Sequence, residues 1–177
     1  MKVLLLFLVP FLGFFFVSEE EKIVWDANRP LTWEDFRGIP NRADDFVAST
    51  NSGISVSFSF KERNGVATIS YTVVSNFYPD LSWYRPERVS TYILEHEQNH
   101  FDISELHARK LRKALSALTH NKDFKEKAEA IYNTVEAERR AMQTLYDSES
   151  DHSNIEEAEY QWRKIVAEKL KALDTWK

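Results

Sequence analysis

The chain has 177 residues, of which 43% are hydrophobic and 29% charged, and its formal net charge is −5 at pH 7. This length favours a single domain, and the acidic balance argues against a nucleic-acid partner. The absence of cysteine excludes disulfides, thiolate metal sites, a cysteine nucleophile and a lipid-bearing cysteine.

The first eighteen residues differ from the rest of the chain. Lys2 precedes an apolar run at residues 3–17 (VLLLFLVPFLGFFFV), and three glutamates follow from Glu19. This layout is typical of a secretory signal peptide, because the run is shorter than the roughly 20 residues of a membrane span. We expect a signal peptide at 1–18, a single domain at 19–177, and a secreted or periplasmic protein. No stable membrane span is expected after cleavage, whereas an uncleaved leader would anchor the protein in the membrane.

Residues 19–83 have the pattern of strands and turns. Residues 54–60 (ISVSFSF) and 66–73 (VATISYTV) alternate with period two, and Asn64-Gly65 between them is a hairpin turn signal. We expect one buried face, formed on the first strand by Ile54, Val56, Phe58 and Phe60. A short strand at 23–25 and a turn at 31–38 are expected before the hairpin.

Helical spacing replaces this pattern after Pro86, which suits a first helical position. Three helices are expected, at about 86–118, 122–145 and 154–173, and Ser153 with Glu156 forms a capping box for the third. The first carries an inward row at Ile93, His96, His100, Ile103, His107, Leu111, Ala114 and Leu118. Leu145 and Ile155 are expected to face inward on the second and third. The predicted fold class is therefore α+β, with a small antiparallel sheet packed against a three-helix C-terminal layer (84–177).

The chemistry concentrates on the first helix. Residues 96–100 (HEQNH) form an HExxH segment, which places His96 and His100 one helical turn apart and about 6 Å along the axis. Both rings can then reach one metal ion, and Glu97 can point at a water molecule on it. Chance accounts for only about 0.01 such matches in a chain of this composition.

Burial strengthens this interpretation. His96 and His100 lie in the apolar row of the helix, so two imidazoles must find partners inside the domain. The alternative is a pair of core histidines bonded to carbonyls or carboxylates, with Glu97 in solvent. The combination of His96, Glu97 and His100 favours a metal site over this alternative. A site with imidazole ligands and no thiolates favours Zn²⁺.

A catalytic zinc needs a third protein ligand. His107 lies about 10 Å along the helix from His100, too far to share the ion, and His120 falls at the predicted bend. The second helix should return toward the site and bring residues 146–153 (YDSESDHS) to its mouth as a loop. His152 is therefore the preferred third ligand. The rival ligands are Glu136, Glu138, Asp147 and Asp151.

Several segments together resemble one known family. Residues 96–109 (HEQNHFDISELHAR), 31–38 (LTWEDFRG), Ser82-Trp83 and the 146–153 segment are similar to the bacterial predicted secreted zinc-dependent proteases, catalogued as domain of unknown function 922. The resemblance implies a zincin-like metalloprotease domain, with His96, His100 and His152 as zinc ligands and Glu97 as the catalytic carboxylate. This chain has Ser150 where the family usually has threonine and Ser153 where it usually has glycine.

The expected function is an exported zinc metallopeptidase acting on a peptide or protein substrate. Glu97 would be the general base and acid, and Tyr146 a second hydrogen-bond donor to the substrate, although Tyr146 also suits the edge of the core. Asp102, Glu105 and Asp147 are expected to orient ligand imidazoles. Residues 109–113 (RKLRK) favour a solvated basic face. The alternatives are a secreted or envelope binding module with a structural zinc, and an amidase with the same zinc chemistry.

Overall fold

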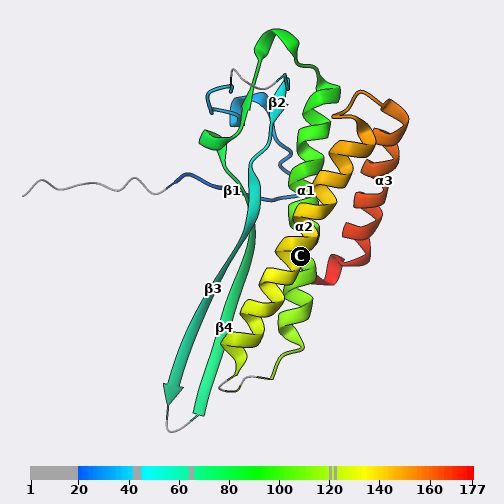
Figure 1. Cartoon of the computed structure of the whole chain (residues 1–177). Coiled ribbons are helices and arrows are strands. Elements are labelled where there is room, and N and C mark those ends of the chain that lie inside the picture. Colours follow the sequence, from blue (N-terminus) through cyan, green and yellow to red (C-terminus); the bar gives the residue numbers. More distant parts are fainter. Residues whose placement is uncertain (1–19, 42–44, 64–65, 120, 122) are drawn as a thin grey trace, which may run out of the picture.

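A computed structural model describes residues 20–41, 45–63, 66–119, 121 and 123–177 (Figure 1). A three-stranded antiparallel sheet with strand order β1-β4-β3 is covered by helices from the C-terminal half, which confirms the predicted α+β class. α1 (Thr91–Ser116) is the central helix, because it contacts the sheet, α2 (Phe124–Ser150) and α3 (Glu156–Ala172). The expected signal peptide lies outside the described residues.

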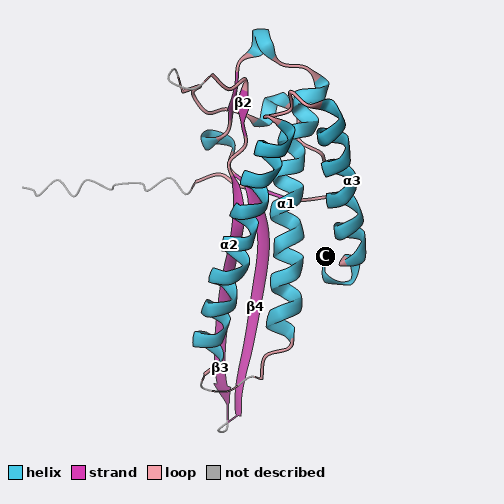
Figure 2. Cartoon of the chain, turned by 45° about the vertical axis from the view of Figure 1, so that its right-hand side comes forward, coloured by secondary structure: helices cyan, strands magenta, loops and turns pink. Residues whose placement is uncertain are grey.

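The long hairpin forms as predicted and extends beyond the helices. β3 (Ser52–Arg63) pairs with β4 (Val66–Phe77) over its whole length, with Ser57 opposite Thr72. Ile54 is buried, but Phe58 is 45% and Phe60 64% exposed. The expectation of a continuous buried face is wrong there, because the end of the hairpin projects past the helices that would cover it (Figures 1 and 2). Asn64 and Gly65 lie outside the described residues.

Three shorter strands complete the β part. β1 (Ile23–Val24), at the expected position, pairs with the end of β4. The pattern at 31–38 is confirmed as a turn, which contains a 3-10 segment at Trp33–Asp35. β2 (Ala48–Ser49) and β5 (Trp83–Tyr84) pair as a separate two-stranded sheet that the sequence analysis did not predict.

The three expected helices are present, but their ends differ from the expected ones. Pro86 begins a 3-10 turn, and α1 starts later, where the Ser90 hydroxyl caps the Ile93 amide. α2 continues to Ser150, so most of the segment expected as a loop is helical. The predicted capping box before α3 is wrong, because the N-cap is Ile155 and has no side-chain cap. Leu145 and Ile155 are each 49% exposed, contrary to expectation.

Two arginines of the expected basic face are instead structural. Arg109 is 3% exposed, donates to Glu105 Oε1 at 2.9 Å and to the Leu170 carbonyl at 2.8 Å. Arg112 donates to the carbonyls of Val73 and Trp176, so it joins α1 to the sheet and the C-terminal turn. No described helix has the length and apolar character of a membrane span.

Candidate metal centre

The two histidines of the HExxH segment face the interior of the domain. His96 and His100 are 5% and 7% exposed, and their Nε2 atoms lie 3.3 Å apart. The predicted burial of both rings on one face of α1 is confirmed. Because the apolar row of the helix continues with Ile103, which is fully buried, packing of α1 against its neighbours directs both imidazoles inward.

A carboxylate from α2 completes a group of three. Asp147 Oδ1 lies 2.9 Å from His100 Nε2 and 3.4 Å from His96 Nε2. Ligand atoms about 2.0–2.1 Å from a tetrahedral zinc ion are about 3.3 Å apart, so this triangle has the size of one face of such a site. Although both imidazoles are near, Asp147 Oδ1 is buried without a hydrogen-bond partner in the part of the chain that the structure describes. The three side chains could therefore hold a metal ion.

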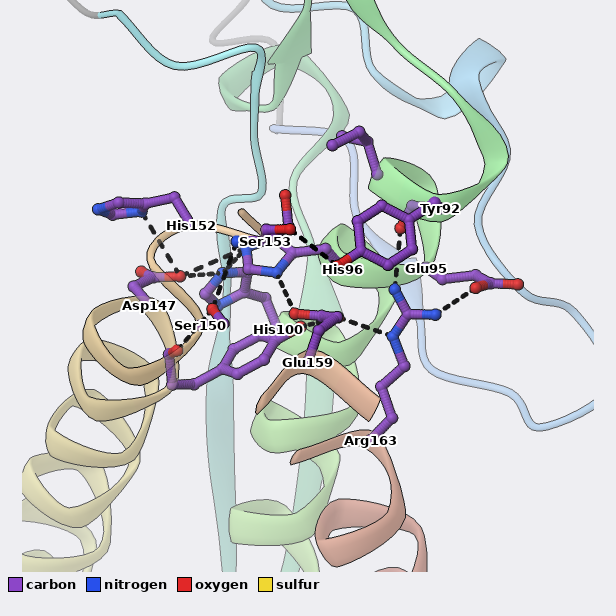
Figure 3. Close-up of polar contacts among 12 residues, drawn as sticks. Tyr92, Glu95, His96, His100, Asp147, Ser150, His152, Ser153, Glu159 and Arg163 are labelled. Atoms are coloured by element: carbon purple, nitrogen blue, oxygen red, sulfur yellow. Dashed lines mark hydrogen bonds and ion pairs between the residues drawn. The ribbon is translucent and has the colours of Figure 1, made fainter. Parts of the chain in front are cut away.

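Acceptors on other helices fix the outer nitrogens of both rings, and Figure 3 shows the one that contacts His96, Glu159. His96 Nδ1 lies 2.9 Å from Glu159 Oε2, and His100 Nδ1 lies 3.1 Å from Gln143 Oε1. The Gln143 amide nitrogen is engaged with the His100 carbonyl, which supports the orientation of the amide. Because both outer partners are acceptors, each Nδ1 donates a hydrogen. The Nε2 lone pair of each neutral ring is then free for a metal.

Charges at the centre alter the ionisation of its members. Burial alone lowers the pKa of His96, but contacts with the carboxylates of Asp147 and Glu159 raise it to about 9. Burial raises the pKa of Asp147, but the adjacent His100 and His96 rings hold it well below its usual range. Without a metal, His96 is therefore protonated at neutral pH, and metal binding has to displace that proton.

A cleft of about 430 Å³ opens onto the centre. His96, His100 and Asp147 form part of its wall, and residues 45–50, which include β2, form another part. Glu97 also lines the cleft; it is 4% exposed, and its Oε2 atom is buried with no hydrogen-bond partner among residues 20–41, 45–63, 66–119, 121 and 123–177. A buried carboxylate oxygen with no partner beside three potential metal ligands is placed to bind a water molecule or a substrate.

One family model matches the region of the chain that contains this site. The family model described as "Bacterial protein of unknown function (DUF922)" matches residues 35–153. The chain belongs to the DUF922 family. No curated protein and no solved structure matches it. The DUF922 match spans Glu97 and the triad of His96, His100 and Asp147, and it ends before α3.

His152, the preferred third ligand, lies at the mouth of the cleft in this DUF922 protein. Its side chain is 47% exposed, its Nδ1 is 3.9 Å from Asp147 Oδ1, and its ring packs 4.6 Å from Phe46. The structure brings Asp147, one of the rival ligands, closer to the two histidines. The turn that carries His152 has positive φ at Asp151, His152 and Ser153, with 72° at Ser153. Glycine, which the family resemblance led us to expect at position 153, would adopt that conformation without strain.

Tyr146 lies behind His96 and does not line the cleft. It is fully buried, its ring stacks on His96 with 4.6 Å between centroids, and its hydroxyl donates to Glu159 Oε1 at 2.5 Å. Burial and the Glu159 carboxylate raise the pKa of Tyr146. This placement agrees with the structural interpretation of Tyr146, and its role as a donor to substrate stays a prediction.

The remaining polar residues are engaged elsewhere. Asp102 accepts from Trp25 Nε1 at 2.7 Å and Glu105 pairs with Arg109, so the expectation that they orient a ligand imidazole is wrong. His107 is packed in the core, whereas His120 lies outside the described residues. Among the other rival ligands, Glu136 pairs with Arg139, Glu138 pairs with Lys110 and Asp151 is the C-cap of α2.

Sequence reasoning missed the two outer acceptors, Gln143 and Glu159. Glu159 is fully buried on α3, three and seven residues before Trp162 and Val166, which are also buried. The sequence feature that could have identified Glu159 is the position of a carboxylate in the apolar row of an amphipathic helix. Gln143 lies one turn before Asp147 on α2, and no comparable signal marks it.

Proposed function

We propose that this DUF922 protein is an exported zinc metallopeptidase, with His96, His100 and Asp147 as the zinc ligands and Glu97 as the catalytic carboxylate. The observation that carries the proposal is the buried Glu97 oxygen in the cleft beside the triad, which has no hydrogen-bond partner among the described residues. A structural zinc site does not need such a carboxylate. The apolar leader in the sequence supports export.

The donor set fits zinc. Two imidazoles and one carboxylate are typical of catalytic zinc sites, which keep a fourth position open, and separations of 2.9 to 3.4 Å suit tetrahedral geometry. When bound, zinc would lower the pKa of a water molecule toward about 7 and polarise a substrate carbonyl. Glu97 would accept the proton of that water and deliver it to the leaving amine. Gln143 would keep the His100 imidazole in the required tautomer.

The cleft wall supports a peptide as the substrate. Among the described residues β2 has one strand neighbour, β5, and on that side the Val47 carbonyl accepts from the Arg85 amide at 2.9 Å. Backbone groups of successive residues in an antiparallel strand point to opposite sides, so those of Ala48 face away from β5. Ala48 lines the cleft, where an extended peptide could add alongside β2 by main-chain hydrogen bonds.

The decisive variant is Glu97→Gln in the full chain. We expect about one zinc per chain in wild type and variant alike, and a 10²- to 10⁴-fold lower rate of peptide hydrolysis in the variant. Elemental analysis and a broad peptide library measure the two quantities. Glu138→Gln, a change at an exposed glutamate on α2, is the matched control and should keep full activity. A zinc-loaded wild type that cleaves no peptide would refute the peptidase proposal.

A structural zinc site is the second proposal, and the position of His152 favours it. His152 Nδ1 is 3.9 Å from Asp147 Oδ1, so a small movement of its turn would supply a fourth protein ligand. Four protein ligands are typical of structural sites. A chelator should then lower the melting temperature markedly, and Glu97→Gln should leave every measurable function intact. Hydrolysis of non-peptide amides instead of peptides would identify an amidase.

A further inference from the structure

We propose that Glu159 and Arg163 of α3 are positioning residues that set the tautomer of His96, an inference that rests on the proposed metal site. They lie beyond residues 35–153, the range matched by the family model. The metal centre of this chain would therefore depend on a helix outside that range.

The two oxygens of Glu159 have separate partners. Oε2 faces His96 Nδ1 at 2.9 Å, whereas Oε1 accepts from the Tyr146 hydroxyl at 2.5 Å and from Arg163 Nε at 2.7 Å. Because Glu159 is fully buried, no bulk water can replace these partners. The two donors on Oε1 fix the orientation of the carboxylate and leave Oε2 to accept from His96.

Arg163 holds this carboxylate through a guanidinium group that is itself fixed (Figure 3). Besides Glu159, it donates to the Tyr92 carbonyl at 2.9 Å and to the Glu95 carboxylate. The guanidinium lies 5.1 Å from the Tyr92 ring centroid and 5.6 Å from that of Tyr160. The three nitrogens of this planar guanidinium donate to three separate acceptors. Lysine could not replace arginine here, because its ammonium group lacks that fixed geometry. Arg163 therefore ties α3 to the first turns of α1, just before His96.

A glutamine at position 159 would reverse the polarity of the contact with His96. Its amide oxygen should take the place of Oε1, because Tyr146 and Arg163 both donate there. The amide NH₂ would then face His96 Nδ1 and donate to it. The proton of the neutral imidazole would move to Nε2, the atom that faces Asp147 and His100. A protonated Nε2 cannot bind a metal.

The test compares Glu159→Gln with wild type in the full chain. Competition with a chelator measures zinc affinity, and we expect it to fall about 10- to 100-fold in the variant. Nitrogen NMR of the metal-free protein at alkaline pH should show the His96 proton on Nδ1 in wild type and on Nε2 in the variant. Glu105→Gln removes another buried carboxylate of a helix, one whose ion-pair partners among the described residues are the arginines Arg109 and Arg112, and it should leave zinc affinity and tautomer unchanged.

Arg163→Met provides a second variant in case Glu159→Gln does not fold. It keeps the carboxylate on His96 but removes the fixed donor, so we expect a several-fold loss of zinc affinity with the wild-type tautomer. Unchanged affinity and tautomer in Glu159→Gln would overturn the positioning role. Absence of zinc binding in wild type would instead refute the proposed function, and the NMR comparison would still decide what Glu159 does to His96.

Discussion

Two buried polar clusters lie on α1 about two turns apart, and they differ in how completely their atoms are paired. In the first cluster, which surrounds Glu105, this carboxylate accepts hydrogen bonds from Arg109 and Arg112. Both arginines also donate to backbone carbonyls. In the metal cluster, Glu97 Oε2 and Asp147 Oδ1 are buried with no hydrogen-bond partner among the described residues.

The difference separates a structural role from a binding role. Buried polar groups are normally hydrogen-bonded, so a fully paired cluster accounts for its own burial. In the described part of the chain, Glu97 Oε2 has no hydrogen-bond partner and Asp147 Oδ1 has only imidazoles as ion-pair partners, so both oxygens are available to a metal ion, water or substrate at one cleft. Removing a carboxylate from the paired cluster should therefore affect the stability of the fold, and removing one from the metal cluster should affect binding.

Glu105→Gln should produce the largest loss of stability. Arg109 would lose its anionic partner while remaining 3% exposed, and breaking a buried ion pair by changing one member typically costs 3–5 kcal/mol. We expect the free energy of unfolding to fall by roughly 3 kcal/mol, as measured by denaturant titration. A loss below about 1 kcal/mol would show that the paired cluster does not stabilise the fold as its geometry indicates.

The core histidine His107 should make stability depend on pH. Burial lowers the pKa of His107 to about 4, from 6.5 in an unfolded chain. Its Nδ1 donates to the Ile103 carbonyl at 2.8 Å, and the Lys110 ammonium lies 3.3 Å from Nε2, so the folded state favours the neutral ring.

The folded pKa of His107 is depressed, so between pH 6.5 and 4 the unfolded state binds the extra proton. Stability should therefore be lost as pH falls through this window, by about 3 kcal/mol in total. Denaturant titrations across the window would measure the loss in wild type and in His107→Leu. The variant should lack this part of the pH dependence, while carboxylates elsewhere affect both proteins alike. Equal slopes in the two proteins would assign the effect to other groups.

The sequence predicted the parts of this site that depend on local periodicity. The row from Ile93 to Leu111 fixed the inward direction of His96 and His100, and alternation identified the hairpin. Periodicity could not reveal β2, because a two-residue strand has no period to detect.

Tertiary packing accounts for the end of α2, which the sequence analysis placed too early. Residues 146–151 (YDSESD) have the composition of a loop, but Tyr146 packs against His96 and Trp162, and the helix continues through Ser150. Local composition was outweighed by burial of one aromatic ring. That extension places Asp147 on a helix face toward α1, one turn after Gln143, and so brings it to the two histidines.

Variants at the two candidate third ligands should have the smallest effect among these predictions, and their zinc affinities distinguish Asp147 from His152. Asp147→Asn removes the charge that lies 2.9 Å from His100 Nε2, and we expect at least tenfold weaker zinc binding, about 1.4 kcal/mol. His152→Ala should change zinc affinity less than Asp147→Asn, because its side chain is 47% exposed and packs on Phe46. Chelator competition measures both variants. If His152→Ala weakens binding more than Asp147→Asn does, then metal binding moves the turn at residues 151–153, and the ligand set becomes His96, His100 and His152 as the family resemblance implies.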